Sequence, residues 1–169
     1  MIDRIVLCGF MGSGKSTVGK ALSEKLGWEL IDTDEFIEAQ ENMSIPQIFA
    51  EKGEPAFRSM EHNAAKLLAN KKHCIISTGG QLMTVERNAA LYRGSDSLVV
   101  YLDLEFSQCY DRIKNSDRPL VAKNTVQQLE EIFNHRRSLY QKAANFTVSN
   151  NGELCDTVNQ IITQLNPYT

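Results

Sequence analysis

GFMGSGKST, residues 9–17, decides the fold of this chain because it fits the pattern G-x-x-x-x-G-K-[ST]. The apolar run from Arg4 to Cys8 before it predicts a short strand, and residues 17–26 after it predict a helix. A glycine-rich turn between a strand and a helix points several backbone N–H groups inward, at the positive end of the helix dipole. The stretch therefore predicts a nucleotide-binding phosphate loop, against the simpler alternative of a glycine-rich turn with a solvated lysine.

Two side chains of this loop have the chemistry that a nucleotide and its metal ion need. Lys15 can reach the terminal phosphates as a mobile positive charge, and the Ser16 hydroxyl can ligate a phosphate-bound Mg²⁺. The loop residues that we expect to contact the nucleotide are Gly12, Ser13, Gly14, Lys15, Ser16 and Thr17. The expected ligands are therefore ATP, as co-substrate, and Mg²⁺.

The size and charge of the chain limit the kinds of protein that it can be. Its 169 residues predict one domain, 1–169, with a substantial core. The net charge of −3 gives no electrostatic reason to bind nucleic acid or an anionic membrane. The first residues do not resemble a secretory signal, so we expect a cytoplasmic protein, and a monomer. The four cysteines are scattered without a C-x-x-C pair, which predicts buried, reduced thiols.

Five apolar stretches alternate with helix-length segments along the chain. The predicted strands are 4–8, 29–31, 74–77, 98–102 and 146–148. The predicted helices are 15–26, 34–40, 45–52, 56–70, 84–92, 106–114, 126–142 and 153–165. Strands joined by helices predict a three-layer α/β fold, with a roughly five-stranded parallel sheet between helices. Residues 115–124 are polar and basic and contain Pro119, which predicts a mobile loop.

Polar or glycine-rich groups follow two more of the predicted strands. Asp32 and Asp34 follow the second strand, and S-T-G-G at 77–80 follows the third. Because ligands bind beyond the carboxyl ends of parallel strands, we expect these groups and the phosphate loop to share a pocket. One aspartate can support the metal shell and the other can accept from a substrate hydroxyl. Either one can instead cap the following helix, a role that is compatible with the site.

Arg58 and Glu61 lie one helical turn apart in the segment 53–61. A carboxylate at this spacing can orient a guanidinium, and a guanidinium can bind a ligand carboxylate through two hydrogen bonds. Taken alone, the pair is more typical of a weak ion pair on an exposed helix surface.

Several separated motifs, in this order, resemble the shikimate kinases, small P-loop kinases related in fold to nucleoside monophosphate kinases. The motifs are G-F-M-G-S-G-K-S-T at 9–17, D-T-D at 32–34, G-E-x-x-F-R-x-x-E at 53–61, S-T-G-G at 77–80, R-P-L at 118–120 and R-x-x-x-Y at 136–140. The resemblance implies transfer of the γ-phosphoryl group of ATP to the 3-hydroxyl of shikimate. The products would be ADP and shikimate 3-phosphate, in the chorismate pathway to the aromatic amino acids.

The resemblance also implies roles for individual residues. The substrate-binding residues that it implies are Asp34, Arg58, Gly79, Gly80 and Arg136, with the helical region 34–61 on the acceptor side. The catalytic residues that it implies are Lys15, Asp34 and Arg118. Arg118 would lie on a lid, residues 115–124, that closes over the phosphates. Ser16 would bind Mg²⁺ directly and Asp32 through coordinated water, while Arg112 would lie near the adenine.

One position departs from the family pattern, which usually reads G-G-G where this chain has Gly79, Gly80 and Gln81. A side chain there costs on the order of 1 kcal/mol or more if the backbone needs a positive φ or a close approach. A glutamine could instead donate to a substrate hydroxyl. Two other functions stay open: a kinase for another small hydroxy acid such as gluconate, and a non-catalytic nucleotide-binding regulatory domain.

Overall fold

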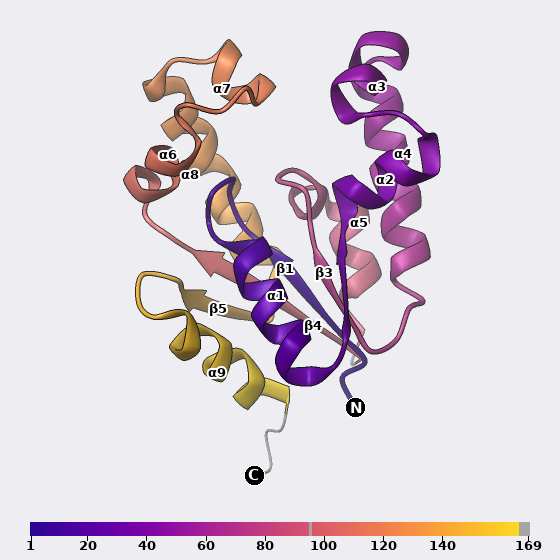
Figure 1. Ribbon diagram of the computed structural model, residues 1–169, viewed down its shortest axis with the longest axis vertical. Coiled ribbons are helices and arrows are strands. Elements are labelled where there is room, and N and C mark those ends of the chain that lie inside the picture. Colours follow the sequence, from indigo (N-terminus) through magenta and orange to yellow (C-terminus); the bar gives the residue numbers. More distant parts are fainter. Residues whose placement is uncertain (95, 166–169) are drawn as a thin grey trace.

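The computed structural model of the chain describes residues 1–94 and 96–165, so residues 95 and 166–169 of the predicted domain lie outside the described residues. Five strands form one parallel sheet in the order β2-β3-β1-β4-β5. Their bounds are β1 (Arg4–Cys8), β2 (Glu29–Asp32), β3 (Cys74–Ser77), β4 (Ser97–Asp103) and β5 (Phe146–Ser149). Helices flank the sheet (Figure 1), which confirms the predicted α/β fold.

The helices are α1 (Lys15–Leu26), α2 (Thr33–Glu41), α3 (Ile45–Lys52), α4 (Glu54–Leu68), α5 (Glu86–Ala89), α6 (Phe106–Ile113), α7 (Pro119–Lys123), α8 (Val126–Ala143) and α9 (Leu154–Leu165). Most of the helices begin and end close to the predicted positions; α5 and α7 do not. Side-chain caps fix several helix starts: Ser44 caps α3, and Thr125 and Gln128 form a capping box on α8. None of the described helices is long and apolar enough to cross a membrane.

The central strand β1 has a buried core on each of its two faces. Because side chains alternate along a strand, Ile5 and Leu7 pack against α1 and α9, while Val6 and Cys8 pack against α4 and α8. All five residues of β1 are buried. The loop that follows β1 therefore starts from one of the most firmly packed points of the molecule.

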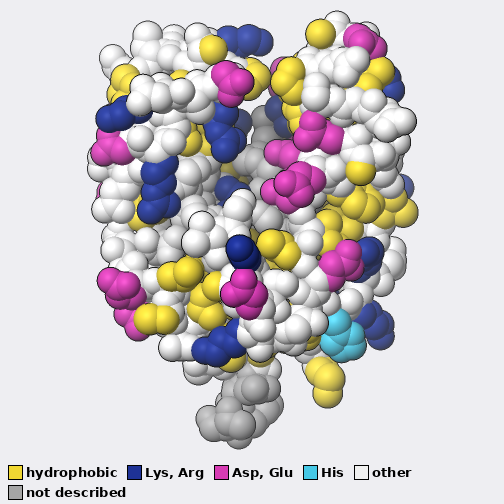
Figure 2. All heavy atoms as spheres, viewed as in Figure 1, with side chains coloured by type: hydrophobic (Ala, Val, Ile, Leu, Met, Phe, Trp, Pro, Cys, Tyr) yellow, Lys and Arg dark blue, Asp and Glu magenta, His cyan; other side chains and the backbone are white. Residues whose placement is uncertain are grey.

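Helices α2, α3 and α4 share a smaller core of their own. Ile37, Ile48, Phe57 and Ala64 form its buried centre. These helices lie together at the β2 side of the sheet, and α6, α7 and α8 lie on the other side (Figure 1). Figure 2 shows that the surface is hollowed between the two groups, with Lys and Arg side chains along one wall and Asp and Glu side chains along the other.

Two segments differ from the sequence prediction. The helix predicted for 84–92 is wrong: Val85 is extended, so only a short α5 forms, between 3₁₀ turns at Leu82–Thr84 and Ala90–Tyr92. The loop predicted for 115–124 contains α7. Proline is tolerated at the first position of a helix and holds the residue before it extended, so Pro119 begins α7 after an extended Arg118.

The cysteine prediction holds for three of the four thiols. Cys8, Cys74 and Cys109 are buried, but Cys155 is exposed. Cys155 lies in the first turn of α9, outside the buried stripe of that helix, which is formed by Thr157, Val158 and Ile161.

Candidate active site

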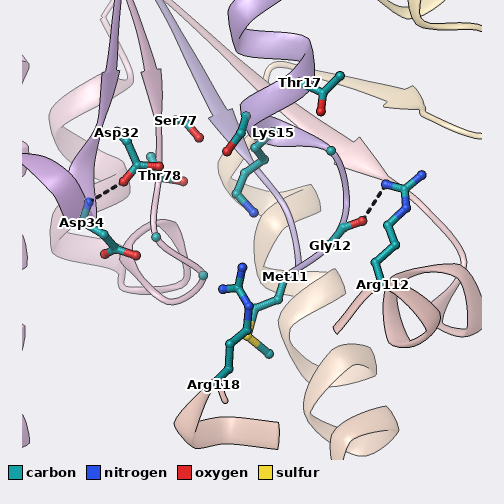
Figure 3. A pocket seen from close by; sticks show the side chains of 14 residues that line it. Met11, Gly12, Lys15, Thr17, Asp32, Asp34, Ser77, Thr78, Arg112 and Arg118 are labelled. Atoms are coloured by element: carbon teal, nitrogen blue, oxygen red, sulfur yellow. Dashed lines mark hydrogen bonds between the residues drawn. The ribbon is translucent and has the colours of Figure 1, made fainter. Parts of the chain in front are cut away.

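A cavity of about 270 Å³ opens where β1, β2 and β3 end, close to the lower limit for small-molecule sites. Its walls come from the phosphate loop, the ends of β2 and β3, and the segment around α6 and α7 (Figure 3). The residues that line it are Met11, Gly12, Gly14, Lys15, Ser16, Thr17, Asp32, Asp34, Ser77, Thr78, Gly79, Gly80, Arg112 and Arg118. The three strand ends that the sequence singled out therefore meet in one cavity.

The phosphate loop has a backbone that requires glycine. Gly12 and Gly14 have φ angles of 77° and 99°, and a Cβ on Gly12 would lie 2.8 Å from a backbone carbonyl of α6. Asn150, to which the sequence gave no role in the loop, supports it, since Nδ2 donates to the carbonyl of Ser13 at 2.8 Å. The Ser13 side chain is buried outside the cavity, and its backbone N–H donates to the carbonyl of Phe10 at 3.1 Å, so a bound phosphate would have to replace that contact.

Lys15 points into the cavity from the start of α1 (Figure 3). Its Nζ donates to the backbone carbonyls of Gly9 at 2.7 Å and Phe10 at 3.1 Å. Burial lowers the pKa of Lys15 to about 8, so the Lys15 amine is still mainly protonated and positively charged at pH 7. A mobile cation is thus held at the point where the phosphate loop opens.

Asp32 and Asp34 face the cavity from the junction of β2 and α2. Asp32 Oδ1 accepts from the backbone N–H groups of Asp34 at 2.9 Å and Glu35 at 3.1 Å, so Asp32 caps α2 and also lines the cavity. Burial, assisted by the negative charge of Asp32, raises the pKa of Asp34 to about 6. A carboxylate with this pKa can accept a proton from a bound hydroxyl near neutral pH.

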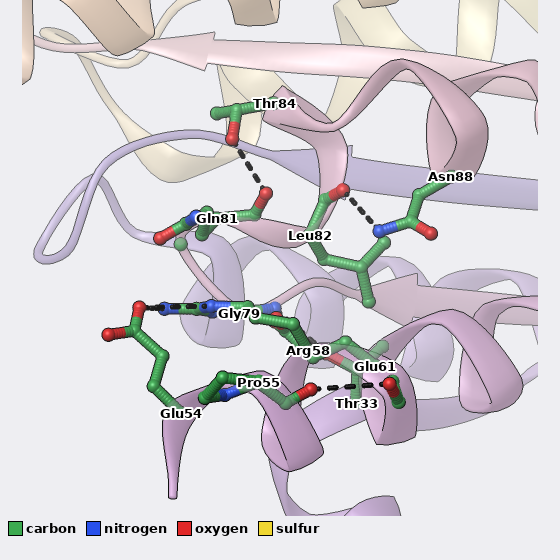
Figure 4. A network of polar contacts seen from close by, with 12 residues as sticks. Thr33, Glu54, Pro55, Arg58, Glu61, Gly79, Gln81, Leu82, Thr84 and Asn88 are labelled. Atoms are coloured by element: carbon green, nitrogen blue, oxygen red, sulfur yellow. Dashed lines mark hydrogen bonds and ion pairs between the residues drawn. The ribbon is translucent and has the colours of Figure 1, made fainter.

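Thr33, between the two aspartates, joins α2 to the turn after β3. Its hydroxyl is fully buried and accepts from the backbone N–H of Gly79 at 2.8 Å (Figure 4). A Cβ on Gly79 would lie 2.7 Å from Asp34 Oδ1, so only glycine leaves the carboxylate where it is. Sequence reasoning missed Thr33, whose only signal is its place between two aspartates.

Arg58 and Glu61 form a close ion pair on α4, with 2.6 Å between Arg58 Nη1 and Glu61 Oε1 (Figure 4). The Glu61 side chain is 3% exposed, so the pair is not the exposed surface pair that the sequence alone favoured. Burial raises the pKa of Glu61 while the hydrogen bond from Arg58 opposes that effect.

Arg136 of α8 approaches the same region from the other side. Its positive charge also acts to lower the pKa of Glu61, and its Nη1 would lie 3.2 Å from a Cβ on Gly80. Arg58 and Arg136 are not among the residues that line the cavity; Arg136 lies behind the turn formed by Gly79 and Gly80. The neighbouring Arg137 pairs with Asp103 at 2.7 Å.

Two further arginines lie at the open side of the phosphate loop. Arg112 of α6 donates to the carbonyl of Gly12 at 2.8 Å, and the exposed Arg118 precedes α7 and reaches the cavity (Figure 3). Both side chains line the cavity, and the roles that the resemblance implies for them, near the adenine and on a lid, stay predictions.

The oxygen ligands of the cavity suit a metal ion that arrives with a nucleotide. The hydroxyl of Ser16 and the carboxylate of Asp32 line the same cavity. Within residues 1–94 and 96–165, no group of three or more His, Cys, Asp or Glu side chains could hold a metal ion. Mg²⁺ in phosphoryl-transfer enzymes takes one or two protein ligands and completes its shell with water and phosphate oxygens. The residues present therefore fit a nucleotide-bound Mg²⁺.

Known proteins resemble this chain over nearly all of its length. A family model described as "Shikimate kinase" matches residues 11–166. A "Shikimate kinase" of Sulfurihydrogenibium sp. (strain YO3AOP1) is 41% identical over 143 residues, which cover 84% of this chain and 85% of that protein. A "Shikimate kinase" of Aquifex aeolicus (strain VF5) is 43% identical over 141 residues, 83% of each chain. The structure of "Shikimate kinase from Acinetobacter baumannii in complex with shikimate" has a TM-score of 0.89 and 33% identity, covering 99% of this chain and 94% of that one.

Replacement of Asp34 by asparagine should stabilise the folded protein at high pH. The pKa of Asp34 is about 6 in the folded state against an ordinary 3.8, so the unfolded chain binds fewer protons between these values and stability falls as the pH rises through them. Thermal unfolding should therefore give Asp34→Asn a higher Tm than the parent at pH 8, and a similar Tm at pH 4. The matched control Asp111→Asn, on the exposed surface of α6, should show no such gain. A Tm difference that is the same at both pH values would contradict the raised pKa.

Proposed function

The chain belongs to the shikimate kinase family, and we propose that the residues around its cavity carry out the reaction of that family. As a member of this family, the protein is an ATP-dependent kinase that transfers a phosphoryl group to a hydroxyl of shikimate. One observation carries the assignment of residues: Lys15, a phosphate-binding cation, and Asp34, a carboxylate with a raised pKa, face the same cavity.

The phosphate loop binds the donor in this proposal. Backbone N–H groups of residues 12–17 hold the phosphates of ATP at the start of α1. Lys15 leaves the carbonyls of the loop and turns to the phosphates, where its charge stabilises the negative charge of the transition state. Arg112 lies beside the adenine.

The metal ligands in this proposal are the hydroxyl of Ser16, in direct contact, and Asp32, through water. When bound, Mg²⁺ neutralises charge on the β- and γ-phosphates. Asp32 is held in place because it also caps α2.

The acceptor lies between α2, α4 and α8. Arg58 and Arg136 bind the carboxylate of shikimate, because a guanidinium matches a carboxylate through paired hydrogen bonds. Gly79 and Gly80 allow the ring to approach the backbone, and Asp34 orients the 3-hydroxyl. Asp34 takes the hydroxyl proton as that oxygen bonds to the γ-phosphorus, and the bond from the γ-phosphorus to the bridging oxygen breaks. The products are shikimate 3-phosphate and ADP.

Residues 115–124 act as a lid in this proposal. Arg118 stands before α7 and already reaches the cavity, so closure of a short segment adds a second positive charge at the phosphates and excludes water. The region 34–61, which has a small core of its own, holds the acceptor. We propose that residues 1–169 work as one domain and as a monomer, in the cytoplasm, where ATP is available.

The two alternative functions account for fewer of these residues. A kinase for gluconate would use the same phosphate loop, but several curated shikimate kinases are 36–43% identical to this chain over most of its length. A non-catalytic nucleotide-binding domain would have no use for Arg58 or Arg136, nor for a carboxylate such as Asp34 in the nucleotide cavity.

Coupled ADP release with shikimate, quinate and gluconate tests the proposed function. Shikimate with MgATP should give rapid ADP release, and the other two acids should give little. Lys15→Ala should lose most of the turnover, because it removes a phosphate-bound charge. The matched control Lys20→Ala, on the exposed side of α1, should retain turnover. Release with gluconate but not with shikimate would reject the substrate, and ATP binding without any acceptor-dependent release would favour the non-catalytic alternative.

The pH dependence of kcat/KM tests the two ionisable groups. Asp34 accepts a proton only when it is ionised and has a pKa of about 6, whereas Lys15 is needed in its charged form and has a pKa of about 8. A pH profile of kcat/KM for shikimate should therefore rise through about pH 6 and fall above about pH 8. Asp34→Asn should have a lower rate without the rise near pH 6. The same rise in that variant would assign it to another group.

A further inference from the structure

The turn after β3 is attached to α8 by two side chains that lie one helical turn apart. The Tyr140 hydroxyl donates to the carbonyl of Gly80, and Arg136 Nη2 approaches Gln81 Oε1 at 3.4 Å. The second contact is long for a hydrogen bond and is therefore weak, but it shows which atoms of the two side chains face each other. Gln81 is thus the residue of the turn whose side chain faces an arginine that we assign to the acceptor.

The backbone conformation at position 81 does not require glycine. Its φ and ψ angles are −105° and −15°, which any residue adopts without strain. Its carbonyl accepts from the Thr84 hydroxyl at 2.7 Å (Figure 4). The backbone of this position is therefore fixed locally, and the side chain is free to serve another purpose.

The chemistry of the contact fixes which end of the amide faces Arg136. A guanidinium only donates, so the oxygen of Gln81 must face it and the Nε2 group, with its two donors, faces elsewhere. Within the described part of the chain, no hydrogen bond acceptor engages Nε2. Gln81 therefore adds a donor next to the guanidinium of Arg136.

Two guanidinium groups and several carboxylates lie around this turn. Arg58 and Arg136 both act on the buried Glu61, one through a 2.6 Å ion pair and the other through its charge. Glu54 also contacts Arg58, but its side chain is 59% exposed, so solvent screens that pair. Asp34 is a further carboxylate close enough for the charge of Glu61 to raise its pKa. An added negative charge at position 81 would therefore weaken the attraction that the two guanidinium groups offer an anionic ligand.

We propose that Gln81 is a specificity-determining residue that selects an acceptor with a carboxylate. Its Oε1 faces Arg136 without cancelling the positive charge, and its Nε2 donates to the same carboxylate. A glutamate at this position would have the same shape but would pair with Arg136 and repel the acceptor. The inference rests on the proposed function, because it takes shikimate as the acceptor.

Steady-state kinetics with shikimate and with its uncharged methyl ester test this role. Gln81→Glu should raise the KM for shikimate about tenfold or more, and Gln81→Met by a smaller factor, with kcat within about twofold of the parent. With the methyl ester, which the parent already binds weakly, both variants should leave KM within about twofold. Gln127→Glu makes the same charge change on an exposed part of α8 and should alter neither value. The Tm of each variant shows that it is folded.

The outcomes separate the two proposals. No shikimate-dependent ADP release by the parent protein would overturn the proposed function, and with it the acceptor assigned to Gln81. Normal turnover by the parent, with the shikimate KM of both variants unchanged, would overturn the role of Gln81 alone. An equal rise in KM for shikimate and for the ester would also overturn it, because the effect would then not depend on the carboxylate.

Discussion

The position of Asp34 in the cavity depends on one contact between the ends of two neighbouring strands. The buried Thr33 hydroxyl accepts from the backbone N–H of Gly79 at 2.8 Å, and Asp34 Oδ1 lies against the space where a Cβ on Gly79 would be. The contact follows from strand pairing, because β2 and β3 are parallel neighbours with Asp32 opposite Ser77. It places the carboxylate of Asp34 in the cavity and keeps it partly buried, and that burial raises its pKa to about 6.

Burial acts in opposite directions on Asp34 and Lys15, the two ionisable groups of the proposed mechanism. It raises the pKa of Asp34 to about 6 and lowers that of Lys15 to about 8, since in each case it disfavours the charged form. Between these two pKa values both groups are mainly in the ionised forms that the proposed phosphoryl transfer requires. The same enclosure costs folding stability, which is common at sites that are shaped for function. In the role that we propose for it, the neutral Gln81 faces Arg136 without cancelling the positive charge that would attract a carboxylate.

The sequence predicted much of this arrangement because its decisive signals are local. The phosphate loop, the strand ends and most helices are set by patterns within about ten residues, and β1, α1, α3 and β3 have the predicted bounds. What depends on contacts across the chain could not be predicted. The break at Val85 and the start of α7 at Pro119 are different, because they are local features that the sequence prediction missed. The bond from Gly79 to Thr33 spans 46 positions, and the contact between Arg136 and Gln81 spans 55. No local sequence pattern indicates such pairs, because only the folded arrangement of strands and helices brings these residues together.

Catalysis by this site should depend on where the turn after β3 holds Asp34, and Gly79→Ala tests that dependence most directly. The φ angle of Gly79 lies outside the positive range, so the added Cβ meets one obstacle, the end of the Asp34 side chain at 2.7 Å. The variant should fold with a Tm near that of the parent and bind ATP normally. Its kcat with shikimate should fall to about that of Asp34→Asn. A folded Gly79→Ala protein with the parent kcat would contradict the claim that this contact sets the catalytic position of Asp34.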